Sequence, residues 1–174
     1  NQQEEWLING LTQSIKEKTK WNLLAQQVMM MPFTYPKSRA AGTINMDSWS
    51  GYAQSRKRII DAITERKLTK VIVAAGDVHK HHAGLIPAKE GDLDGKMAAT
   101  EFVGTSISSG GDGSDFPIGW DTALSDNPHC PFISDRRGYQ IFTITPNSFI
   151  SDIKTVNKVT DTNGELSTAA RFAV

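Results

Sequence analysis

The sequence has a single cysteine, no excess of either charge and no long hydrophobic run. Cys130 has no partner within the chain, which excludes an internal disulfide framework and a cysteine-rich zinc module. Lys and Arg together number 19, as do Asp and Glu, and no basic block occurs. We therefore expect no role on bulk nucleic acid or on an anionic membrane surface. No apolar run approaches the roughly 20 residues that a bilayer crossing needs, so we expect no membrane span.

What is present is typical of a folded domain. The 174 residues are 39% hydrophobic and 22% charged, which lies within the usual range of globular proteins. Two segments, residues 4–18 and 52–66, have the periodicity of amphipathic helices. Their predicted inward residues are Leu7, Leu11 and Ile15 in the first and Ile59, Ile60 and Ile63 in the second, while Arg56, Lys57 and Arg58 are expected to point largely outward.

Apolar runs and alternating patterns predict the strands of an α/β fold. The first run is mostly apolar and predicts a buried strand, and the second predicts a central strand of the sheet. The alternating residues 138–145 and the run that follows them across a turn indicate an antiparallel C-terminal third. Residues 32–50, rich in Pro, Gly, Ser and Asn, predict a long loop, and an irregular segment is expected through Pro117, Pro128 and Pro131. The predicted strands are residues 21–31, 70–75, 97–104, 138–145 and 149–156, with a further hairpin turn at 163–164.

The densest group of chemically active side chains is the string Gly-Asp-Val-His-Lys-His-His at residues 76–82. It follows a predicted central strand, and ligands of α/β sheets collect beyond the carboxyl ends of strands. Asp77 and His79 are two residues apart, so in an extended segment both side chains leave on one side. A carboxylate and an imidazole suit zinc, iron or manganese, or calcium with further oxygens. The alternative is a Gly-Asp turn with solvated histidines.

Two other regions allow a structural and a functional interpretation. Asp47 and Trp49 end the long loop, where Asp47 or Ser50 is expected to cap the following helix and Trp49 to pack as an anchor; the functional alternative places Asp47 and Trp49 on the rim of a ligand cleft. The Gly-rich residues 106–113 lack the Gly-Lys-Ser/Thr ending of a phosphate-binding loop, so a mobile turn is favoured. A structural turn is likewise favoured over a Cys–His nucleophile pair at residues 129–130.

Several strings occur in series along nearly the whole chain. They are QEEWL at residues 3–7, Trp21 followed by QQVMM at 26–30, Asp47 with Trp49, Gly51, Tyr52 and Arg56, GDVH at 76–79, TEFVGTSISSGGDG at 100–113, NPH at 127–129 and RGY at 137–139. In this order and at this spacing they resemble the PhoD family of alkaline phosphatases and phosphodiesterases, which belongs to the metallophosphoesterases.

The resemblance implies a phosphate-ester hydrolase that uses metal-activated water. Its fold would be part of a four-layer α/β/β/α metallophosphoesterase sandwich, the C-terminal half with mixed and antiparallel strands. The family's metal centre is described as iron together with calcium, and by analogy Asp77 and His79 would be catalytic metal ligands. The substrate would be a phosphomonoester or a phosphodiester. The implied substrate-side residues are Gln27, Asp47, Trp49 and His81.

Relatives in the family are considerably longer, and their remaining ligands lie upstream of the region of resemblance. Residues 1–174 are therefore expected to be a single partial domain, the C-terminal portion of an enzyme whose partner is the missing N-terminal half of the same polypeptide. Two ligands cannot fill a multinuclear centre, since calcium alone takes roughly 6–8 oxygens, so the isolated chain is expected to be inactive. Relatives are usually exported, which implies an extracellular or periplasmic location.

Two alternatives stay open from the sequence alone. The chain could be a non-catalytic secreted binding or structural module that keeps the fold without a complete metal centre. It could also bind nucleic acid by aromatic stacking, for which four Trp and seven Phe are available, although no basic stripe accompanies them and we expect no nucleic-acid binding.

Overall fold

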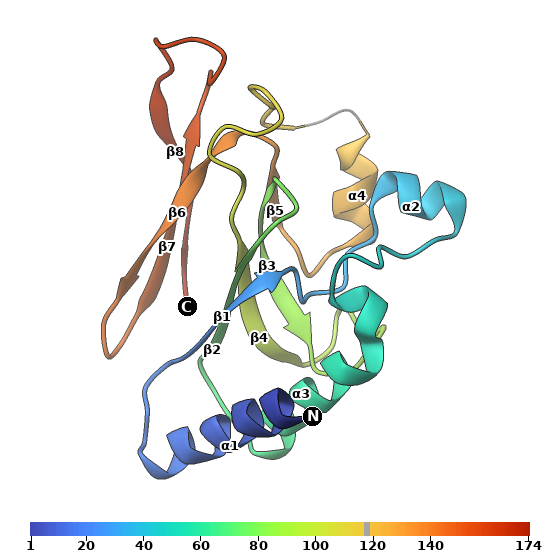
Figure 1. The fold of residues 1–174 in the computed structure, drawn as a ribbon, viewed down its shortest axis with the longest axis vertical. Coiled ribbons are helices and arrows are strands. Elements are labelled where there is room, and N and C mark those ends of the chain that lie inside the picture. The colour runs from blue at the N-terminus through green and yellow to red at the C-terminus, as the bar shows by residue number, and fades with distance from the viewer. Residues whose placement is uncertain (117–118) are drawn as a thin grey trace.

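The computed structural model describes residues 1–116 and 119–174. Helices and strands alternate along the first half, and strands dominate the second half (Figure 1). The helices are α1 (Gln2–Lys16), α2 (Pro36–Ala41), the 3-10 turn η1 (Trp49–Tyr52), α3 (Ala53–Glu65) and α4 (Trp120–Asp126). The strands are β1 (Asn22–Val28), β2 (Val71–Gly76), β3 (His81–Pro87), β4 (Met97–Val103), β5 (Phe132–Ser134), β6 (Arg137–Ile144), β7 (Phe149–Val156) and β8 (Leu166–Ala173).

The strands form two sheets, as the predicted mixed and antiparallel α/β fold requires. Sheet A has the order β1-β2-β4-β3-β5. Within it β1, β2 and β4 run parallel, whereas β3 is antiparallel to both β4 and β5. Sheet B is an antiparallel meander of β6, β7 and β8. The three parallel strands of sheet A therefore end at one common edge.

Each face of sheet A is covered differently because side chains alternate along a strand. Val71 and Val73 belong to a core shared with α1, α3 and α4. Ile72, between them, belongs to a second core with Phe149 and Ile153 of sheet B. The described chain is therefore layered as helices, sheet A and sheet B, with sheet B to the left of sheet A in Figure 1.

The two predicted helices are present, with local differences in burial. In α1 the Asn1 side chain accepts a hydrogen bond from the Glu4 backbone N–H at 3.0 Å, which caps the helix. Leu11 is buried, but Ile15 is exposed rather than inward. In α3 the predicted inward isoleucines are all buried.

Arg56 contradicts the expected outward orientation. It is only 2% exposed, donates from Nη1 to the Met30 carbonyl at 3.3 Å and pairs through Nη2 with Glu90 at 2.5 Å. A buried guanidinium is tolerated when its donors are used in this way. The charge pattern along the helix carried no sign of these partners, which lie elsewhere in the chain.

The predicted strand at residues 21–31 is shorter and less buried than expected. β1 ends at Val28, and its residues alternate between exposed and half-buried. Among the described strands, β1 pairs only with β2, so it is an edge strand in this structure. Met29, Met30 and Met31, which follow the strand, are the buried residues of this run.

Several short elements were not expected from the sequence. α2 lies inside the predicted long loop, begins with Pro36 at its first turn and ends at Gly42, whose φ of 62° is left-handed. β3 begins at His81, within the segment expected to be a loop. α4 and β5 lie in the segment that was expected to be irregular, of which Pro117 lies outside the described residues.

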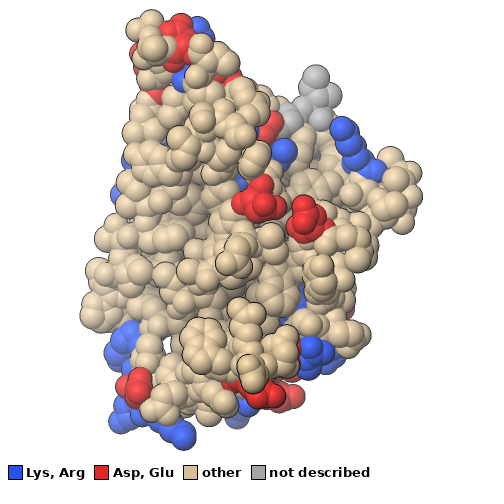
Figure 2. Space-filling model, viewed as in Figure 1, with Lys and Arg blue, Asp and Glu red and all other residues tan. Residues whose placement is uncertain are grey.

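In the part of the chain that the structure describes, no helix is both long and apolar enough to cross a bilayer. On the face drawn in Figure 2, Lys and Arg lie in separate groups around the margin of the molecule, and uncharged atoms occupy most of the centre.

Candidate functional site at the carboxyl edge of sheet A

The carboxyl ends of β1, β2 and β4 lie side by side. Val28 of β1 is in register with Gly76 of β2, and the Gly104 N–H after β4 donates to the Ala75 carbonyl at 2.8 Å. Residues 77–80, which we call the crossing loop, leave β2 and enter β3, which lies beyond β4 in the sheet. The crossing loop therefore passes over the end of β4 at the edge where α/β sheets usually bind ligands.

Asp77 and His79 lie in the crossing loop, and both are exposed. The backbone there is not extended as expected, because φ is 72° at Asp77 and 54° at His79. The spacing argument for a common direction of the two side chains therefore does not apply. Val78 between them packs against the core cluster that contains the buried isoleucines of α3, and this contact anchors the crossing loop. Two non-glycine residues with left-handed φ in one short loop are uncommon, and such residues cluster at functional sites.

The two exposed donors fit a metal ion only in part. Carboxylate and imidazole are suitable ligands for iron, and a carboxylate is suitable for calcium. Among residues 1–116 and 119–174, however, no group of three or more His, Cys, Asp or Glu side chains is close enough to hold a metal ion. Asp77 and His79 can thus supply two donors, and the further donors of a metal centre would have to come from outside the described residues.

A groove of about 660 Å³ runs along β1, between α1, β1, η1 and α3, and reaches the carboxyl end of the strand at Val28. Gln27 and Trp49 both line it, so the structure brings these two predicted residues together. The remaining lining is largely apolar and includes Trp6, Leu7 and Leu23. Asp77 and His79 are not among the lining residues. Their loop follows β2, the neighbour of β1 in sheet A.

Trp49 is fixed to the end of β1 by its own polar atoms. Its backbone N–H donates to the Met29 carbonyl at 3.2 Å, and its indole N–H donates to Gln26 Oε1 at 3.0 Å. Gln26 rather than Gln27 is therefore the glutamine that orients the indole. Asp47 is exposed two residues before Trp49. It does not cap the following helical turn, because Ser48 is the N-cap, its hydroxyl accepting from the Ser50 N–H at 3.3 Å.

His81 is enclosed rather than open to a ligand. It is 0% exposed in β3, and its Nδ1 lies 3.4 Å from Nε2 of Gln140 on sheet B. Its Nε2 has no hydrogen-bond partner among the described residues. Burial lowers the pKa of His81 to about 4, so the ring is neutral near pH 7. In this structure the ring is part of the packing between the two sheets.

Glu101 is a buried acidic residue that the sequence reasoning missed. It is 0% exposed, and its carboxylate accepts from the backbone N–H groups of Met30 at 2.7 Å and Met31 at 2.5 Å. Burial raises the pKa of Glu101 to about 7, despite these two hydrogen bonds. Glu101 thereby holds the turn that follows β1 and carries the carbonyl bonded by Trp49.

The Gly-rich loop and the His-Cys pair have structural roles. Asp112 accepts from the backbone N–H groups of Val159 at 2.7 Å and Thr160 at 3.0 Å, which ties the loop to the β7–β8 connection. His129 Nε2 lies 2.6 Å from the Pro32 carbonyl. The thiol of Cys130 is buried, and burial raises its pKa to about 12, so the thiolate needed for nucleophilic attack is not formed near pH 7.

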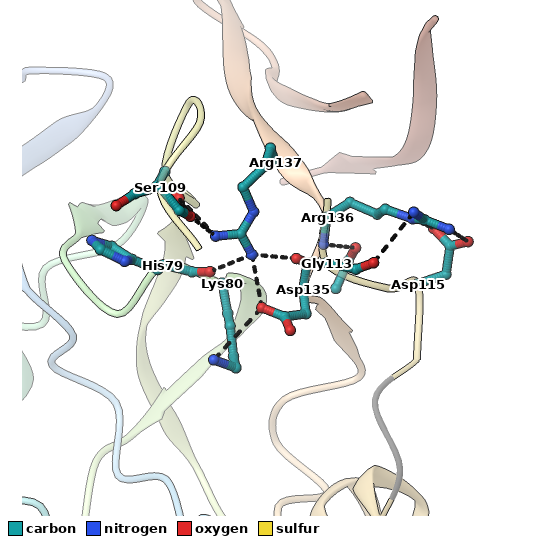
Figure 3. A network of polar contacts seen from close by, with 10 residues as sticks. His79, Lys80, Ser109, Gly113, Asp115, Asp135, Arg136 and Arg137 are labelled. Carbon is teal, nitrogen blue, oxygen red and sulfur yellow. Dashed lines mark hydrogen bonds and ion pairs between the residues drawn. The ribbon is translucent and has the colours of Figure 1, made fainter. Parts of the chain in front are cut away.

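Arg137 is the second residue that the sequence did not single out as functional. Its guanidinium lies under the crossing loop and donates to the His79 carbonyl at 3.0 Å (Figure 3). The only sequence signal was the Arg-Gly-Tyr string at residues 137–139, which contributed to the resemblance without assigning a role to the arginine.

Three comparisons with known proteins all identify PhoD-like phosphatases as similar to this chain. A family model described as PhoD-like phosphatase matches residues 1–153. Over 171 residues the chain is 39% identical to alkaline phosphatase D of Bacillus subtilis (strain 168), a match that covers 98% of this chain and 29% of the relative. A solved structure described as that of PhoD superposes with a TM-score of 0.91 at 37% identity, covering 99% of this chain and 32% of that chain. The chain thus spans less than a third of the length of these relatives.

Proposed function

The chain belongs to the PhoD-like phosphatase family, and from that membership we propose that it is the C-terminal portion of a hydrolase of phosphomonoesters or phosphodiesters. Residues 1–174 would then form part of one domain of a longer polypeptide. The observation that supports this most is the crossing loop, which presents Asp77 and His79 to solvent at the carboxyl edge of sheet A.

In this proposal Asp77 and His79 would hold iron or calcium together with donors from the rest of the polypeptide. Such ions, when bound, neutralise the charge of a phosphate ester and lower the pKa of a coordinated water, so that hydroxide is available near neutral pH. In this proposal the residues of this chain bind the metal ions and orient the phosphate ester. Gln27 offers an amide at the groove, Trp49 forms an apolar wall there, and Asp47 lies on the exposed loop before it.

The edge of β1 supports the proposal that the N-terminal half of the same polypeptide covers this side. An edge strand presents unpaired backbone groups that another strand can use. Here the strand also borders an apolar groove in which Leu23 is 42% exposed.

The location of the protein is a separate part of the proposal. By the family resemblance, the complete polypeptide would be exported to the periplasm or the medium, which cell fractionation would test.

The test uses the complete polypeptide with p-nitrophenyl phosphate and bis(p-nitrophenyl) phosphate as substrates. Asp77→Ala and His79→Ala should each lower kcat by at least about 100-fold, the upper end of the range found for residues that merely support ligands. The matched control is Asp94→Ala, an exposed aspartate in the connection before β4, at the opposite end of that strand. It should leave kcat unchanged.

A non-catalytic binding or structural module is the second candidate, favoured by the lack of a three-residue ligand cluster among the described residues. It predicts that the complete polypeptide hydrolyses neither ester. A hydrolase whose metal is held elsewhere would instead show equal effects of Asp77→Ala and Asp94→Ala on kcat. Either result would exclude a hydrolase in which Asp77 and His79 hold the metal.

A further inference from the structure

Arg137 is a buried arginine whose two terminal nitrogens donate to several acceptors, while its Nε has no partner among the described residues. It is only 2% exposed at the start of β6. Nη1 donates to Ser106 Oγ at 2.7 Å and to the Ser109 carbonyl, and Nη2 donates to the His79 carbonyl at 3.0 Å and to Asp135 Oδ1 at 2.8 Å. Nη2 also contacts the Asp135 carbonyl (Figure 3). Burying a charge is costly unless it is paired and hydrogen-bonded, so this side chain must be held in place by several partners at once.

The partners of Arg137 belong to three segments, two of which are loops that leave the same sheet edge. His79 is in the crossing loop after β2, and Ser106 and Ser109 are in the loop after β4. The turn before β6 supplies the only charged partner among the described residues, Asp135. Most acceptors are therefore main-chain or hydroxyl oxygens, and the planar fork of an arginine satisfies such a divided set better than the single ammonium of a lysine.

Asp135 also binds the second half of the crossing loop. Lys80 Nζ lies 3.6 Å from the Asp135 carboxylate that Arg137 also binds. In Figure 3 the His79 carbonyl points toward the guanidinium, and its imidazole points away. The backbone bond to Arg137 thus fixes the residue while leaving its ring available. Left-handed φ values such as those of Asp77 and His79 persist only when the surroundings enforce them.

We propose that Arg137 is a positioning residue, whose guanidinium clamps the crossing loop to the loop after β4 and so sets the placement of Asp77 and His79. The inference rests on the proposed function, because it concerns the side chains to which that function is assigned. Arg137 itself does not line the groove that contains Gln27 and Trp49, and it is not assigned a contact with substrate.

The chain offers a matched control in the preceding residue. Arg136 donates to Asp115 at 3.2 Å, to the Gly113 carbonyl at 3.3 Å and to the Asn157 carbonyl at 3.0 Å. Figure 3 shows its side chain directed away from the crossing loop. Arg136→Gln therefore removes an arginine that makes a comparable number of hydrogen bonds just before β6, and it leaves the hydrogen bond to the His79 carbonyl intact.

The experiment measures two quantities on the complete polypeptide for Arg137→Gln, Arg137→Lys and Arg136→Gln. Amide hydrogen exchange of residues 77–80 and 105–110 should be at least about 10-fold faster in Arg137→Gln, because local opening loses its restraint. Its kcat should fall about 10- to 100-fold, as for other residues that orient ligands, with KM changed less than about 3-fold because the groove is untouched. Arg137→Lys should not restore kcat, and Arg136→Gln should leave both quantities in these segments unchanged.

Unchanged exchange in Arg137→Gln, faster exchange with unchanged kcat, or an equal fall of kcat in Arg136→Gln would each overturn the inference. If Arg137→Gln does not fold, Ser106→Ala carries the test, since it removes one acceptor of Arg137, together with the bond that the Ser106 hydroxyl donates to the Ser109 carbonyl at 2.7 Å, and adds nothing. It should speed exchange in residues 105–110 and lower kcat, and no change in either would overturn the inference. Failure of the proposed function is distinguishable, because it appears in the wild-type protein as missing activity or as insensitivity to Asp77→Ala.

Discussion

Three buried ionisable residues, His81, His82 and Glu101, respond to pH in opposite directions. Burial lowers the pKa of His81 to about 4 and of His82 to about 3, so the folded protein keeps both rings neutral where the unfolded chain takes up protons. Their stabilisation is present above pH 6.5 and is lost as the pH falls. Burial raises the pKa of Glu101 to about 7, so its contribution is present at low pH and is lost as the pH rises.

His82→Phe should make the protein less sensitive to acid. The ring of His82 is 0% exposed, packs edge-on against Phe33 at 5.0 Å between centroids, and has neither nitrogen hydrogen-bonded among the described residues. Removing this titration should reduce the loss of unfolding free energy below pH 6 by up to about 1.4 kcal/mol per pH unit, the value of one proton. Denaturant titrations of the complete polypeptide between pH 7.5 and pH 5 measure this slope.

Glu101→Gln should have the opposite effect on the same slope. The carboxyl group takes up its proton at a higher pH in the folded state than in the unfolded state, which offsets part of the acid loss due to the histidines. Without it, stability should fall more steeply between pH 7 and pH 5. Identical slopes in wild type, His82→Phe and Glu101→Gln would show that these groups do not titrate as their burial implies.

At the scale of elements, the sequence predicted what has a long periodic or apolar pattern. α1, α3, β2 and β4 are such segments, and the alternating C-terminal strands are as well. The short elements were missed because six residues in α2 and three in β5 carry too little pattern. β3 was missed because its first two residues are histidines, which looked like solvated loop residues and are in fact buried.

The candidate site was predictable in part for a related reason. Asp77 and His79 were selected from residue type and from their place after an apolar strand, and their role as metal ligands stays a prediction. The left-handed backbone, the burial of His81 and the bonds of Glu101 and Arg137 depend on contacts between residues far apart in the chain, which no local pattern reports.

The open edge of β1 leads to a prediction at this scale. Leu23→Asp in the complete polypeptide should lower the free energy of unfolding by at least about 2 kcal/mol, because a carboxylate would be buried where the N-terminal half is proposed to cover the groove. Leu166→Asp is the control, since Leu166 is 53% exposed on β8 and lines no part of that groove. Equal, small losses for both variants in chemical denaturation would contradict this docking surface.

At the scale of the whole molecule, the chain covers 29% of alkaline phosphatase D and 32% of the solved PhoD structure, and our proposal divides the site between this chain and the rest of a longer polypeptide. We therefore expect residues 1–174 alone to show the circular dichroism spectrum of a folded protein and to hydrolyse neither nitrophenyl ester. Metal-dependent turnover by the isolated chain that Asp77→Ala abolishes would show that the described residues are sufficient.

The central claim is that Asp77 and His79 at the carboxyl edge of sheet A complete a metal centre, and elemental analysis tests it most directly. The complete polypeptide, its Asp77→Asn variant and the control Asp94→Asn are each passed through gel filtration, and the bound iron and calcium per chain are measured. We expect wild type and Asp94→Asn to retain their metal and Asp77→Asn to lose it. Equal metal content in all three proteins, or none in the wild type, would contradict the claim.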